Sequence, residues 1–118
     1  MKLSVFAVAF LVFSQLSLAR TEITMYKEVV LSQLNEIGLA VNSVSLSGNT
    51  ELRLSSVDND KCSIVSLYAL VPTNDPKIMS HLNPTTDGSI FKLSINNEHV
   101  AGTKVSVKCT QQAYEFTL

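Results

Sequence analysis

The chain has no tryptophan, only two histidines, and four glycines that lie far apart in 118 residues. Scattered glycines argue against a glycine-rich loop that cradles phosphate, because such a loop needs several of them close together. Nine Lys and Arg residues oppose ten Asp and Glu residues, so the net charge is −1, and no basic cluster occurs. This balance argues against nucleic acid as a partner.

Catalytic and metal-binding motifs are also missing. No serine lies in a Gly-x-Ser-x-Gly elbow, and neither His-x-x-x-His nor Cys-x-x-Cys occurs, so His81 and His99 are expected to be solvated side chains. We therefore expect a protein that is not an enzyme and has no cofactor. The turn Asp58, Asn59 and Asp60 is a weak calcium candidate because it offers oxygen ligands, although these residue types favour turns for backbone reasons alone.

The first residues predict export. Lys2 precedes an apolar run from Leu3 to Phe13, and Ser17-Leu18-Ala19 is a small-x-small cleavage pattern, which together are typical of a secretory signal peptide over residues 1–19. Residues 20–118 are then a single domain, expected to be secreted and extracellular, or periplasmic if the source is bacterial. No second long apolar run follows, so no membrane anchor is expected.

The two cysteines, Cys62 and Cys109, are expected to pair. An even cysteine count in an exported chain indicates a disulfide, and two cysteines leave one possible connection. Cys62 begins one predicted inner strand and Cys109 ends another. The bridge is therefore predicted to lie in the core, between neighbouring or facing strands.

Residues 22–37 are predicted to form an amphipathic helix. Apolar side chains recur there at steps of three and four residues, and Gly38 stands where a helix often ends in a left-handed conformation. The β-branched residues Val29 and Val30 make a strand the alternative. The apolar positions are Ile23, Tyr26, Val30, Leu34 and Ile37.

After Gly38 the apolar residues alternate, which indicates strands joined by short turns. Residues 41–47 and 51–57 are predicted to form a hairpin with one solvent-exposed face, and Val44 and Leu46 are the apolar positions that alternate with serines in its first strand. Lys77 to Leu82 is predicted to form a short helical turn. Further strands are expected at 62–71, 91–95, 105–109 and 114–118. The resulting fold class is α+β and rich in β-structure: an N-terminal helix packed on an antiparallel sheet of five to six strands, with an immunoglobulin-like β-sandwich as the alternative.

Two short segments resemble parts of known families. Glu98, His99, Val100, Ala101 and Gly102 are similar to the Gln-x-Val-x-Gly hairpin of cystatins, with Glu98 in the place of Gln. This resemblance implies a protease inhibitor that uses residues 98–102 as a partner-binding loop. Separately, Val57-Asp58-Asn59-Asp60 and residues 83–90 resemble fragments of cadherin repeats, in which a similar acidic segment holds calcium.

The spacing of the two cysteines is similar to that of immunoglobulin domains, although the Trp of those domains is absent and Val107 stands in place of their Tyr. Taken together, we expect a secreted binding protein whose partner is an extracellular protein or surface ligand. Its contacts would come from loops on a rigid scaffold. Besides protease inhibition, a carrier of a small apolar ligand remains an alternative. The expected loops are Asp58–Lys61, Pro72–Asp75, Asn83–Gly88 and Asn96–Gly102.

Overall fold

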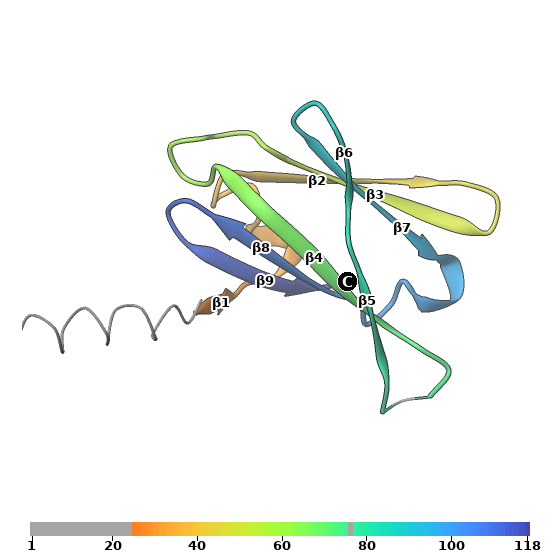
Figure 1. The fold of residues 1–118 in the computed structure, drawn as a ribbon. Coiled ribbons are helices and arrows are strands. Elements are labelled where there is room, and N and C mark those ends of the chain that lie inside the picture. Colours follow the sequence, from red (N-terminus) through yellow and green to blue (C-terminus); the bar gives the residue numbers. More distant parts are fainter. Residues whose placement is uncertain (1–24, 76) are drawn as a thin grey trace, which may run out of the picture.

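The computed structural model describes residues 25–75 and 77–118, so the predicted signal peptide lies outside the described residues. In these residues, nine strands form two sheets that face each other (Figure 1). One sheet has the order β2-β3-β7-β6 and the other the order β1-β9-β8-β4-β5. The strands are β1 Tyr26–Glu28, β2 Leu39–Ser45, β3 Asn49–Ser56, β4 Ile64–Pro72, β5 Met79–Leu82, β6 Thr85–Asp87, β7 Ile90–Asn96, β8 Lys104–Cys109 and β9 Ala113–Thr117, with 3-10 turns η1 Leu31–Gln33 and η2 Asn97–His99.

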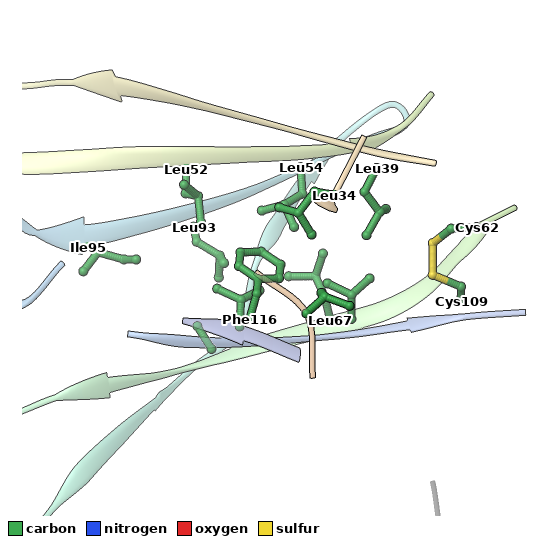
Figure 2. Close-up of a cluster of buried hydrophobic side chains, with 14 residues drawn as sticks. Leu34, Leu39, Leu52, Leu54, Cys62, Leu67, Leu93, Ile95, Cys109 and Phe116 are labelled. Carbon is green, nitrogen blue, oxygen red and sulfur yellow. A yellow bond between two sulfur atoms is a disulfide. The ribbon is translucent and has the colours of Figure 1, made fainter. Parts of the chain in front are cut away.

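The core lies between the two sheets (Figure 2). Alternate residues of each strand point inward, so Leu52 and Leu54 of β3 meet Phe116 of β9 and Leu67 of β4. Phe116 and Leu54 are completely buried. The alternation in the sequence therefore correctly predicted β3, β7, β8 and β9 and their inward faces.

The predicted disulfide between Cys62 and Cys109 is confirmed. It lies at one end of the core and links the end of β8 to the start of β4, because Cys109 is the last residue of β8 and Cys62 lies two residues before β4, which pairs with β8 (Figure 2). Cys62 also stabilises the segment that connects β3 to β4, since its carbonyl oxygen accepts a hydrogen bond from the Ser56 hydroxyl.

The predicted N-terminal helix over residues 22–37 is wrong. Within the described part of this segment, Tyr26–Glu28 is a strand that pairs in parallel with β9, and the Val29 amide donates to the Glu115 carbonyl at 2.9 Å. Val29 is buried whereas Val30, on the predicted helix face, is 58% exposed, so burial does not follow a helical period. Pairing with a distant strand overrides the local helical pattern here, and the β-branched residues suit it. No α-helix occurs in residues 25–75 or 77–118, and none of the structure there could serve as a membrane-crossing helix.

The predicted helical turn at residues 77–82 is also wrong. Asp75 does accept the Lys77 amide through its carboxylate, as an N-cap would. The chain then leaves the turn, and Met79–Leu82 pairs with the open edge of β4 as β5. Ladder hydrogen bonds with β4 replace the bonds that a single helical turn would provide.

The predicted α+β class, in which a helix packs on one antiparallel sheet, is therefore wrong: residues 25–75 and 77–118 form two facing sheets and no α-helix, which is the arrangement of a sandwich. The strand orders β2-β3-β7-β6 and β9-β8-β4-β5 also follow the A-B-E-D and G-F-C-C′ orders of immunoglobulin domains. The disulfide does not follow that plan. In antibody domains it connects the two sheets, whereas here it lies within one sheet.

Candidate functional site

The predicted partner-binding loop at residues 98–102 folds back onto the protein. Asn97–His99 forms η2, whose start is capped by the Asn96 side chain. Val100 packs against the core. Hydrogen bonds from the Gly102 amide to the Leu118 carbonyl and from the Thr103 hydroxyl to the His99 carbonyl hold the following residues against the protein. Glu98, Ala101 and Gly102 are exposed, but Val100 does not protrude as an inhibitory wedge would.

The calcium candidates Asp58, Asn59 and Asp60 form the turn that carries the chain from one sheet to the other. The Asp58 carboxylate accepts the Asp60 amide, and the Asn59 and Asp60 carbonyls accept the side-chain amide of Gln111. Within the described ranges, no group of three or more His, Cys, Asp and Glu side chains is placed to hold a metal ion. The bond to the Asp58 carboxylate accounts for an aspartate at that position by turn geometry.

Three of the four predicted loops lie at opposite ends of the molecule. The fourth, Asn83–Gly88, was wrongly predicted as a loop, because it contains strand β6, Thr85–Asp87. Pro72–Asp75 and Asn96–Gly102 come together, and residues from both line a cleft of about 370 Å³. Asp58–Lys61 lies at the far end of β8, where it contacts Gln111 next to the disulfide. The loops therefore do not form one continuous surface.

A larger groove, which sequence reasoning missed, lies under the edge strand β2. This inter-sheet groove has a volume of about 750 Å³. Its walls are the inward faces of β2 and β3 on one side and η1, Val100 and Leu118 on the other. Ten of its fourteen lining residues are apolar, and none is charged. It is open to solvent, because Leu31 and Val57 on its rim are 47% and 56% exposed.

The groove exists because of a change of pattern within β2. Leu39 and Val41 point inward, and the same face continues with Ser43 and Ser45, which leave the space under the strand unfilled. The apolar residue Val44 instead shares the outward face with Glu51 of β3. The apolar face of this hairpin was predicted to carry Val44 and Leu46, but Leu46 is 51% exposed. The sequence does carry a signal for this groove: the larger apolar residues are Leu39 and Val41 at the start of the segment but Val44 and Leu46 at its end, so the apolar pattern changes from one face of the strand to the other.

A second cluster lies on the outer face of the five-stranded sheet. Tyr68 alternates with the buried residues Leu67 and Ala69, so its ring points away from the core and stacks on His81 with the ring centres 4.9 Å apart. The Tyr26 side chain lies beside that of Tyr68 on this face. Tyr26, an apolar position of the predicted helix, therefore covers the outer face of the sheet together with Tyr68.

Burial raises the pKa of Tyr26 above its ordinary value of 10.0, and Tyr68 and the Glu115 carboxylate raise it further. Because the folded-state pKa is the higher one, this group stabilises the fold fully below about pH 10, and the contribution is lost as the pH rises through the folded pKa. Tyr68→Phe is expected to move the pKa of Tyr26 back toward 10.0 without abolishing the shift, since burial remains. Ultraviolet absorbance titration of tyrosinate measures this, with Tyr114→Phe as the control. Because Tyr68→Phe also removes the absorbance of Tyr68 itself, the midpoint of Tyr26 is compared, and an unchanged midpoint contradicts the assignment.

These geometric features stand without support from relatives. Comparisons with protein-family models, with curated proteins and with solved structures found no match.

Proposed function

We propose that this chain is an extracellular, non-enzymatic binding protein that takes up an apolar part of its ligand in the inter-sheet groove. The volume of the groove, about 750 Å³, is the observation that carries the proposal. Binding sites for small ligands and side-chain clusters typically have volumes in this range, with mostly apolar walls and a few polar groups. The polar groups here are Asn35, Ser43, Ser45 and Thr50.

Two further observations support this proposal. The disulfide is compatible with an extracellular location, where such bonds persist. Val100 of the segment that resembles cystatins lines the groove, so this segment is better suited to shape the site than to enter the cleft of a protease. We therefore propose binding in the groove in preference to protease inhibition.

The neutral apolar dye Nile red tests the groove directly. The purified protein is expected to bind the dye with increased fluorescence, and Ser43→Phe is expected to weaken binding roughly tenfold or more, because an inward-facing ring occupies the groove and removes the apolar burial that drives uptake. Asn42→Phe is the matched control. It adds the same ring to the outward face of the same strand, next to Arg53.

Equal dye binding by wild type, Ser43→Phe and Asn42→Phe would place the dye elsewhere and remove the proposal. Absence of dye binding by the wild type would do the same. Circular dichroism of each variant confirms that a loss of binding does not come from a loss of fold.

A further inference from the structure

We infer that the ligand of the inter-sheet groove is an extended, uncharged segment of a partner protein, which pairs with β2 as an added strand and places alternate apolar side chains in the groove. This inference rests on the proposed function and specifies its ligand. Three features of the structure support it: the backbone of β2, the side chains of the same residues, and the absence of charge in the groove.

The backbone of β2 has a free edge. Leu46 and Asn49 exchange hydrogen bonds at the tip of the hairpin. Because hydrogen-bonded and non-hydrogen-bonded residue pairs alternate along two antiparallel strands, this pair determines which residues of β2 bond to β3. Ala40, Asn42 and Val44 then bond to β3, and the N–H and C=O groups of Val41, Ser43 and Ser45 point away from it. Among the strands that the structure describes, β3 is the one neighbour of β2. Donors and acceptors repeated at every second residue match an extended polypeptide, as in β-strand addition.

The same three residues line the groove with their side chains. A strand paired with β2 would lie about 4.8 Å from it and would direct every second side chain to the groove face. The small side chains of Ser43 and Ser45 leave space for these groups. Because no lining residue is charged, the side chains that enter must be uncharged, since an unpaired charge would lose its hydration there.

The other edges are protected in ways that β2 is not. β1 carries Lys27 and Glu28, β6 has three residues and includes Asp87, and β5 has only four residues. β2 has seven residues, no charge, no proline and a regular register. Charges and short length are the usual protection of an edge strand against pairing, so their absence from β2 marks it as the edge that accepts a strand.

A second copy of this chain fits less well than a foreign segment. A β2 strand from another copy would present serines to the groove at two of its positions, and these would leave most of the volume empty. A partner strand with valine, leucine or phenylalanine at alternate positions fills it. This comparison identifies the occupant as a heterologous strand.

The test uses wild-type protein and a fluorescein-labelled peptide, Lys-Thr-Val-Ser-Leu-Thr-Val-Ser-Phe-Lys, with blocked ends. We expect it to bind and to displace Nile red. Two further peptides are N-methylated at one or the other set of alternate amides. One of them is expected to bind roughly tenfold more weakly because it loses the hydrogen bonds to β2, and the other is expected to retain binding. A peptide of the same composition with its apolar residues adjacent tests the alternation and is expected to bind weakly.

A pair of variants tests the edge from the side of the protein. Ser43→Pro removes an amide that faces the free edge, a position where proline is tolerated in a strand. It is expected to bind the peptide roughly tenfold more weakly than Ser43→Ala, which keeps the amide. Equal binding of both variants, or of all three alternating peptides, overturns the inference.

The remaining outcomes separate the inference from the proposed function. Uptake of Nile red without peptide binding refutes the strand and leaves the groove as an apolar site. No uptake of either probe refutes both. If sedimentation shows a dimer that Ser43→Pro dissociates and Ser43→Ala does not, the occupant is a second copy, and the inferred foreign strand is wrong.

Discussion

Removal of the disulfide is expected to lower the free energy of unfolding by about 4 kcal/mol, as the chain-entropy relation gives for cysteines separated by 47 residues. The bond limits the conformations of the unfolded chain, so its loss acts mainly on that state. A domain of this size is typically stable by roughly 5–15 kcal/mol, so the loss is a large fraction of the total. The Cys62→Ala/Cys109→Ala variant, unfolded in guanidinium chloride, measures the effect.

Reduced wild-type protein is the matched control, because it keeps both sulfur atoms in the core and lacks only the bond. Cys62 is completely buried and Cys109 nearly so. The double variant is therefore expected to be less stable than the reduced wild type, by the packing of the lost sulfur atoms. If oxidised and reduced wild type unfold at the same denaturant concentration, the bond does not stabilise the fold in this way.

The sequence predicted those parts of the fold in which local pattern and tertiary environment agree. β3 alternates Leu52 and Leu54 with Glu51 and Arg53, and the structure buries the leucines and places the charged pair outside. The cysteine pairing followed from the even cysteine count together with the predicted export signal. In both cases no information on tertiary contacts was needed.

The first strand could not be predicted in this way. Tyr26–Glu28 is extended because β9, at the other end of the chain, pairs with it in parallel. Nothing in residues 22–37 identifies that partner. The local spacing of apolar residues favoured a helix, and the hydrogen bonds with β9 decided the outcome.

The inter-sheet groove was missed for a related reason. The hairpin was predicted correctly, but its inward face was assigned from the apolar residues Val44 and Leu46. The register with β3 instead turns Ser43 and Ser45 inward, opposite Leu52 and Thr50. Successive side chains of a strand lie on opposite faces of the sheet, so a shift of one residue in the assignment places every side chain on the wrong face. The candidate site is therefore located where the apolar pattern and the register of the strand disagree.

Substitution of Gly38 by alanine is expected to lower the free energy of unfolding by about 3 kcal/mol, since it combines backbone strain with a steric clash. Gly38 has φ +92°, a conformation that favours glycine. A Cβ atom there would lie 2.8 Å from the Asp58 carbonyl oxygen and 2.9 Å from the Lys61 Cβ. The Gly38 carbonyl also accepts the Val57 amide at 2.9 Å, so neither segment can move without loss of a bond.

Gly48→Ala separates the two contributions. Gly48 has φ +79°, but a Cβ atom there would have no neighbour within 4 Å, so this variant carries the backbone strain alone and is expected to cost about 1 kcal/mol. The difference between the two variants in urea unfolding measures the close approach at Gly38. It matters for the site because Gly38 directly precedes Leu39, which lines the inter-sheet groove, and contacts the turn that leads to Cys62. Equal destabilisation by the two substitutions would show that the segment Asp58–Lys61 moves away from the added methyl group at no cost. In that case Gly38 does not fix the position of β2 relative to this segment.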